Sequence, residues 1–211
     1  PITLAESLRK LGKEAPLVYW VGRDVLFKEN NKMMSRYMQE TFPDIFGSKL
    51  VHMKPLPYSE VQELQSQCSF GTAPSVWDVF NYTVAEFMSL GKPVICSTGA
   101  GAADIVESGI DGFLFKASDA DDLSGLIYKV MKMNPADKEE MGRRAKEKIN
   151  TVLNPQSIAF QRLEIYKTAL SENINKVTEP WINEFFMPSE RKHLIDYDLD
   201  KIPLKEIIQY S

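Results

Sequence analysis

Residues 73–115 read APSVWDVFNYTVAEFMSLGKPVICSTGAGAADIVESGIDGFLF, and this stretch decides the fold class. Two strand-like apolar runs, at 69–73 and 93–96, each lead into a loop and then into a helix-like segment. Such alternation predicts a parallel sheet with helices on its faces. Because ligands of open α/β sheets bind beyond the carboxyl ends of the strands, we expect both loops to lie at one functional edge.

The same alternation extends along the chain as far as residue 171. We expect helices at 4–13, 32–41, 59–67, 121–133, 138–152 and 155–171, and further strands at 17–21 and 50–53. The predicted fold is an α/β, doubly wound parallel sheet with a C-terminal helical extension. We divide the chain into a main domain, residues 1–172, and a helical tail, residues 173–211.

Composition and charge agree with a folded enzyme domain. The 211 residues are 44% hydrophobic and 26% charged, enough to bury one main core. A net charge of -4 and the absence of a basic stripe argue against a nucleic-acid surface. The sequence has no long apolar run and no secretory signal, so the cytoplasm is the expected location, with peripheral membrane contact left open.

The first loop and the start of the helix after it carry most of the polar and aromatic candidates, namely Asp78, Phe80, Asn81, Tyr82, Thr83 and Glu86. Glu86 lies within an otherwise apolar helical pattern at 84–90, where a carboxylate is unusual unless it has a polar partner. Thr83-x-x-Glu86 matches a capping box, in which Glu86 accepts a hydrogen bond from the Thr83 amide. From these residues alone, Glu86 is either such a cap or a ligand for a polar group.

The second loop is a glycine turn, with Gly99, Gly101 and Asp104, that leads to an expected helix at 102–107. Glycine lacks a Cβ, so the backbone of this turn can approach a ligand closely. The turn is not a nicotinamide fingerprint, because a third glycine is missing and Glu107 lies too close to serve as the distant ribose acid. An ordinary strand-to-helix turn is the structural alternative.

The order of these motifs resembles the C-terminal domain of retaining GT-B glycosyltransferases of the group 1 type. The shared elements are Pro-Ser, an acid, a Phe, a Glu eight positions after that acid, Gly-Lys-Pro-Val-Ile, Gly-x-x-acid-x-Val and an acid-Gly-x-Leu turn. The resemblance covers residues 17–170 and is densest at 74–123. It implies a Rossmann-like half of a GT-B fold and a nucleotide diphosphate sugar as donor.

The resemblance gives roles to the two carboxylates of the first loop and helix. Asp78 and Glu86 fill the acidic positions of the family's E-x7-E motif, with Asp in place of the first Glu. It implies that Glu86 hydrogen-bonds the ribose hydroxyls and that Asp78 lies near the donor sugar, and we name both as catalytic candidates. An ionised carboxylate can accept both neighbouring ribose hydroxyls through charge-assisted hydrogen bonds.

The resemblance also implies donor-binding positions at Phe80, at the turn of Asn81, Tyr82 and Thr83, and at Gly22. Asn81 stands where the family usually has Gly, and Asn tolerates left-handed backbone angles. Amides at a helix N-terminus can stabilise a departing diphosphate without a metal. Gly99, Gly101 and Asp104 are implied to line the cleft.

We predict no metal site and no cofactor. Asp119 and Asp121 imitate an acidic metal-binding triplet, and Asp196, Asp198 and Asp200 repeat the spacing. Asp119 and Asp121 directly precede a helical pattern, which favours an N-cap and an acidic first turn. The histidines, His52 and His193, and the cysteines, Cys68 and Cys96, form no metal-ligand spacing.

These observations lead to one functional expectation and one alternative. We expect the donor domain of a retaining hexosyltransferase whose N-terminal acceptor half, with the Arg and Lys that neutralise the diphosphate, is missing from this chain. Alone, the chain is expected to bind nucleotide weakly and to transfer no sugar. The alternative is a non-catalytic nucleotide-binding or scaffolding module of a larger protein.

Overall fold

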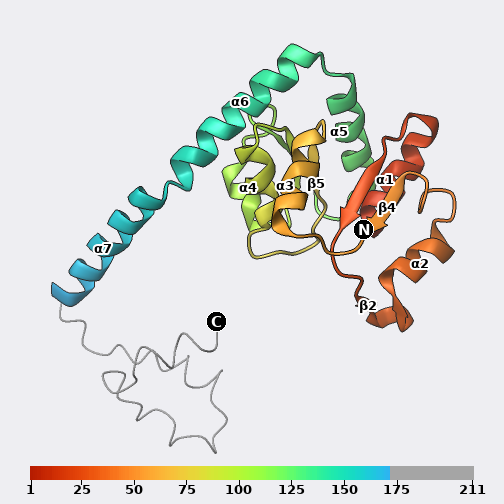
Figure 1. Ribbon diagram of the computed structural model, residues 1–211, viewed down its shortest axis with the longest axis horizontal. Coiled ribbons are helices and arrows are strands. Elements are labelled where there is room, and N and C mark those ends of the chain that lie inside the picture. Colours follow the sequence, from red (N-terminus) through yellow and green to blue (C-terminus); the bar gives the residue numbers. More distant parts are fainter. Residues whose placement is uncertain (172–211) are drawn as a thin grey trace, which may run out of the picture. The chain divides into compact units, whose positions relative to one another are not determined.

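Helices and strands alternate along the chain in a computed structural model that describes residues 1–171 (Figure 1). The helices are α1 (Ile2–Leu11), α2 (Met34–Thr41), α3 (Tyr58–Gln67), α4 (Tyr82–Ser89), α5 (Ala120–Lys132), α6 (Pro135–Val152) and α7 (Pro155–Ser171). The strands are β1 (Val18–Val21), β2 (Leu26–Phe27), β3 (Lys32–Met33), β4 (Leu50–Met53), β5 (Gly71–Ala73), β6 (Val94–Ser97) and β7 (Phe113–Phe115).

The chain divides into two compact units, Pro1–Ser157 and Ile158–Ser211. The first unit holds all the strands of the described residues and helices α1 to α6. Of the second unit, the structure describes only the part of α7 up to residue 171. The tail at 173–211 lies outside the described residues, so the boundary that we place at residue 172 stays a prediction.

Strands β1, β4, β5, β6 and β7 pair in parallel, as the sequence predicts. Strand β6 lies between β5 and β7, and β1 pairs with β4 in a separate ladder whose register joins Val18 to Leu50. Strands β2 and β3 form an antiparallel hairpin. Within residues 1–171, no hydrogen-bonded ladder joins β1 to β5, so one edge of each strand is left without a strand partner.

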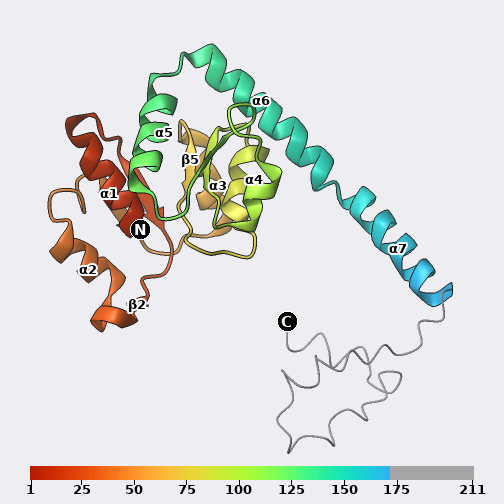
Figure 2. The same ribbon diagram turned by 180° about the vertical axis from the view of Figure 1, so that it is seen from behind.

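Two hydrophobic cores form on opposite sides of β6, because its side chains alternate. Ile95 belongs to a core that includes residues of α1, α2 and α5, whereas Val94 and Cys96 belong to a core that includes residues of α4 and α6. All four residues of β6 are buried. Both views show α1 beside α5, and α3 and α4 on the other side of β5 (Figure 2). The doubly wound fold class is therefore confirmed.

Glycines allow α4 to sit close to β5 and to α6. A Cβ on Gly71 would lie 2.3 Å from the Phe87 ring, and a Cβ on Gly142 would lie 1.9 Å from the carbonyl oxygen of Gly91. Neither contact leaves room for a side chain. This close packing fixes the position of α4 and hence of Glu86.

Two local predictions are wrong. The expected helix at 102–107 is a short 3-10 turn, Gly101–Ile105, because the amides of Gly101 and Ala102 donate to Asp78 and Phe80 in the neighbouring loop. The expected start of a helix at residue 32 is instead strand β3, with Asn31 at the left-handed turn before it (φ 47°). Helix α2 begins only at Met34.

Helix α5 begins at its predicted cap, whereas α6 begins at Pro135, three residues before the expected start at residue 138. The Asp119 carboxylate accepts hydrogen bonds from the amides of Asp121 and Asp122, which confirms the predicted N-cap. Asn134 caps α6 by accepting from the Asp137 amide at 2.8 Å, with Pro135 in the first turn. Asp196, Asp198 and Asp200 lie outside the described residues.

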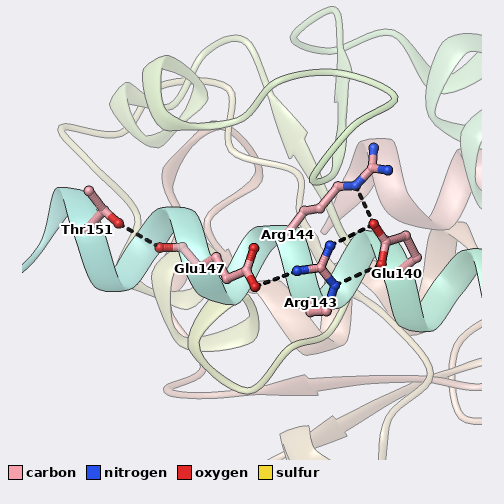
Figure 3. Close-up of polar contacts among 5 residues, drawn as sticks. All are labelled: Glu140, Arg143, Arg144, Glu147 and Thr151. Carbon is pink, nitrogen blue, oxygen red and sulfur yellow. Dashed lines mark hydrogen bonds and ion pairs between the residues drawn. The ribbon is translucent and has the colours of Figure 1, made fainter.

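The exposed face of α6 carries a row of ion pairs (Figure 3). Glu140 accepts from Arg143 and Arg144, Arg143 also donates to Glu147, and Thr151 donates to the Glu147 carbonyl. The two arginines lower the pKa of Glu140 to about 2. Because these side chains are exposed, solvent screens the pairs and their effect on stability is small.

Candidate functional site

A cavity of about 860 Å³ lies along β1 and β5 and reaches helices α3 and α4. Residues of β1 give it apolar walls, and Phe70 and Phe87 add aromatic surface. Its polar lining includes Gln65, Thr72, Ser75, Asn81, Thr83 and Glu86. The cavity therefore combines an apolar wall with a few polar groups, as ligand pockets commonly do.

Glu86 lies on α4 and faces this cavity. Its Oε2 atom accepts a hydrogen bond from Nε2 of Gln65, on α3, at 2.8 Å. Residue Asn81, not Thr83, is the N-cap of α4, and no side chain caps the helix. The capping-box interpretation of Glu86 is therefore wrong, because the carboxylate is directed to a neighbouring helix instead of its own first turn.

Asn81 adopts the left-handed conformation that the sequence analysis allows it. Its φ and ψ are 70° and 86°, and its side-chain amide donates to the Ser75 hydroxyl at 2.9 Å. The turn thus survives the replacement of Gly by Asn. It carries the chain into α4, so that Asn81, Thr83 and Glu86 all line the cavity.

Asp78 belongs to a pair of loops packed against each other. Its amide donates to the Gly99 carbonyl, and its own carbonyl accepts from the Gly101 amide. A Cβ on Gly99 or Gly101 would come within 2.2 Å or 2.1 Å of the carbonyl oxygens of Val76 and Val79, respectively. Both glycines are therefore required by the close approach of the second loop to the first.

The structure brings some of the predicted site residues together and separates others. Asn81, Thr83 and Glu86 share the cavity, and Tyr82 lines a neighbouring cavity of about 510 Å³ that Glu86 also reaches. The remaining candidates line neither of these cavities, namely Gly22, Asp78, Phe80, Gly99, Gly101 and Asp104. Their roles at a donor site stay predictions.

Two of the separated candidates have structural partners. The Asp78 carboxylate accepts from the Phe80 amide at 3.2 Å, within its own loop. The Gly22 carbonyl oxygen lies 3.0 Å from Nε2 of His52, on β4. Gly22 also has a φ of 149°, so the turn after β1 takes a conformation that L residues rarely adopt.

Sequence reasoning missed Gln65 and Thr72. Gln65 is buried in α3, with 6% of its surface exposed, and Thr72 lies on β5. The helix containing Gln65 gives no motif that distinguishes it from the exposed glutamines nearby. Only the packing of α3 against α4 shows that Gln65 reaches Glu86.

The described residues offer no metal centre and no reactive thiol. Within residues 1–171, no three His, Cys, Asp or Glu side chains are grouped so that they could hold a metal ion. Cys96 is fully buried, and burial, together with the charge of Asp78, raises the pKa of its thiol to about 11. Burial also raises the pKa of Cys68. Both thiols are therefore protonated near neutral pH, which disfavours nucleophilic chemistry.

A third cavity, of about 640 Å³, lies between α1 and the 116–121 turn and is not lined by Glu86. Both of its cations on α1 already have partners: Arg9 pairs with Asp44, and Lys10 pairs with Asp121 at 2.7 Å. We assign the functional site to the cavity of Glu86, because there the polar groups and the helix N-terminus converge.

Residues 47–148 match the family described as glycosyl transferases group 1. This part of the chain is therefore similar to group 1 glycosyltransferases. Over 90 residues the chain is 30% identical to an uncharacterized glycosyltransferase of Methanocaldococcus jannaschii, a match that covers 43% of this chain and 25% of that protein. The matched residues 47–148 include the cavity wall formed by α3, β5 and α4.

Solved structures show the same fold at low identity. A glycosyltransferase from Rickettsia africae superposes with a TM-score of 0.69 and 20% identity, covering 80% of this chain and 44% of that one. The Anabaena protein HepE in complex with UDP-glucose gives 0.64 and 18%, covering 77% and 44%. Sucrose-phosphate synthase from Thermosynechococcus elongatus gives 0.64 and 19%, covering 81% and 42%. The chain thus has the Rossmann-like fold of a GT-B half.

The chain spans a quarter of the archaeal relative and less than half of each of these three structures. In residues 1–171, no helix is both long and apolar enough to cross a membrane.

Proposed function

We propose that this chain supplies the donor-binding domain of a retaining glycosyltransferase that takes a hexose from a nucleotide diphosphate sugar. The position of Glu86 carries the proposal: its carboxylate lies on the wall of a cavity, one helical turn into α4, beside Asn81 and Thr83. The match of residues 47–148 to the group 1 glycosyltransferases supports sugar transfer as the reaction. The complex of HepE with UDP-glucose supports a nucleotide sugar as the donor.

Each group has a defined task in this proposal. Glu86 accepts hydrogen bonds from ribose hydroxyls, which are donors, and its negative charge strengthens these bonds. The amides at the start of α4, in the turn of Asn81, Tyr82 and Thr83, face the diphosphate, whose charge grows as the sugar leaves. Phe80, Gly22, Gly99, Gly101 and Asp104 complete the donor site, which uses no metal and no cofactor.

The transfer itself proceeds on one face of the sugar, without a protein nucleophile, and Asp78 lies near the sugar. In this proposal, the cationic groups that neutralise the diphosphate and the acceptor site belong to an N-terminal half. With these groups on another half, residues 1–211 by themselves bind nucleotide weakly and transfer no sugar in this proposal. The cytoplasm is the proposed location.

Nucleotide titration tests the role of Glu86. Ligand-observed NMR with UDP, GDP and ADP should detect binding of at least one nucleotide to the 211-residue chain. Glu86→Gln keeps an oxygen that can accept from Gln65 but removes the charge, so we expect roughly tenfold weaker binding with an unchanged melting temperature. Glu63→Ala, an exposed position on α3, is the matched control and should bind like the wild type.

Unchanged nucleotide binding by Glu86→Gln would remove Glu86 from the site. Failure of the wild-type chain to bind any of the three nucleotides would refute the donor-domain proposal itself. The melting temperature of each variant separates a lost contact from a lost fold.

One observation favours a second candidate function, a non-catalytic nucleotide-binding module. Asp78 directs its carboxylate to the Phe80 amide in its own loop and does not line the cavity of Glu86. Such a module would bind nucleotide through Glu86 without transferring sugar. Release of UDP from UDP-glucose by the full-length protein that contains this chain would decide for the enzyme.

A further inference from the structure

Only one of the two polar atoms of the Gln65 carboxamide has a hydrogen-bond partner. Its nitrogen donates to Oε2 of Glu86 at 2.8 Å, but its Oε1 atom is buried and accepts no hydrogen bond. The residue is 94% buried and lines the cavity of about 860 Å³. A buried acceptor without a partner is uncommon in native proteins and calls for an explanation.

Thr72, on strand β5, also has a buried polar atom without a hydrogen-bond partner. This atom is the hydroxyl oxygen, and Thr72 lines the same cavity. Within residues 1–171, the side-chain polar atoms that are buried and unpaired are these two oxygens. Both lie at the cavity that holds Glu86, which is where a ligand would supply the missing hydrogen bonds.

We infer that Gln65 is a second ribose-binding residue, paired with Glu86. Nε2 of Gln65 holds Oε2 of Glu86, while Oε1 of Gln65 accepts a hydrogen bond from one ribose hydroxyl and Oε1 of Glu86 accepts from the other. The inference rests on the proposed function and extends its ribose site from one side chain on α4 to a pair from α3 and α4.

The chemistry of the pair predicts which nucleotides bind. A ribose offers two neighbouring hydroxyl donors, and the pair offers two acceptors. A nucleotide that lacks one hydroxyl leaves a buried acceptor unpaired, and sites built around a hydroxyl reject the analogue without it. The site should therefore prefer ribonucleotides to deoxyribonucleotides, and Gln65 should contribute to that preference.

Titration of the 211-residue chain with UDP, 2′-deoxy-UDP and 3′-deoxy-UDP tests this inference. We expect the wild type to bind UDP about tenfold more tightly than at least one of the two deoxynucleotides. Gln65→Met removes both polar atoms at similar length, so UDP binding should weaken about fivefold to tenfold and that preference should disappear. Gln62→Met is the matched control on α3, where Gln62 contacts Tyr58 at 3.1 Å and does not line the cavity.

A change in stability alone would not remove the preference for UDP over a deoxynucleotide. Gln65→Asn keeps the carboxamide but is too short to hold Glu86, so it should lose the same preference even if Gln65→Met fails to fold. If the folded variants keep the wild-type preference for UDP, Gln65 has only a structural role and the inference is overturned.

Binding of UDP and both deoxynucleotides with equal affinity by the wild type would also overturn the inference, while leaving nucleotide binding intact. No binding of UDP, GDP or ADP would instead refute the proposed function.

Discussion

Asn81 shows how one residue can keep a turn after the usual glycine is replaced. The left-handed conformation at this position is unfavourable for most L residues, but its free-energy cost is smaller for Asn than for branched or bulky side chains. The hydrogen bond to Ser75 adds a second reason for Asn, because it ties the turn to the beginning of its own loop. The residue thus sets the direction in which the chain enters α4.

Substitutions of Asn81 should separate the backbone requirement from the side-chain bond. Asn81→Ala should destabilise the fold by about 1–2 kcal/mol, since Ala disfavours a φ of 70°. Asn81→Gly should cost less than about 0.5 kcal/mol, because it loses the bond to Ser75 but removes the backbone strain. Urea titration gives the free energy of unfolding of each variant. Equal stabilities for the two variants would show that the backbone conformation is not the limiting factor.

Elements are held in place by a few buried contacts more than by their exposed charges. The carboxylate of Asp111, with 3% of the side chain exposed, accepts from the Glu107 amide at 2.7 Å and pairs with Lys148 on α6 at 2.9 Å. This pair joins the turn before β7 to α6. The ion pairs of Arg143 with Glu140 and Glu147, on the same helix, join exposed side chains only (Figure 3).

A matched pair of substitutions on α6 compares these two kinds of contact. Lys148→Met leaves the buried Asp111 carboxylate without its cation, so we expect a loss of about 1–3 kcal/mol in the free energy of unfolding. Arg143→Met removes an exposed cation of the same helix and should change stability little. Thermal unfolding followed by circular dichroism measures both. If Arg143→Met destabilises as much as Lys148→Met, burial does not decide the strength of these pairs.

At the scale of the whole molecule, the two cores place the cavity of Glu86. The cores fix α1, α2 and α5 on one side of β6, and α4 and α6 on the other. The ladders of β1 and β5 remain separate, and the cavity lies along both strands. A ligand that enters there contacts the apolar wall of β1 and the polar ends of α3 and α4 together.

The 211-residue chain alone should bind nucleotide without transferring sugar. The physical reason lies in the proposed function, in which Glu86 and the start of α4 hold the nucleoside and a separate N-terminal half supplies the cations for the leaving diphosphate. Incubation with UDP-glucose, followed by measurement of released UDP, should give no signal above buffer, while UDP still binds in the NMR titration. Release of UDP by the wild-type chain but not by Glu86→Gln would contradict this prediction, because the site would then be complete.

The local sequence determined the elements and their order. Hydrophobic periodicity placed β4 at its observed bounds and α3 and α5 within a residue, since turn signals bound each of them. Asp119 marked the start of α5, and the motif order at 74–123 indicated a resemblance to the group 1 family that the match of residues 47–148 supports. These features depend on residues close together in the chain.

Only the tertiary structure decided the contacts between elements. The partner of Glu86 is Gln65, 21 residues away on another helix, and the amides of Gly101 and Ala102 are used by the loop at 78–80 instead of by a longer helix. Such choices depend on which elements pack together and on how much space a glycine leaves between them. Sequence thus specified what the elements are, and packing specified which polar groups meet at the cavity.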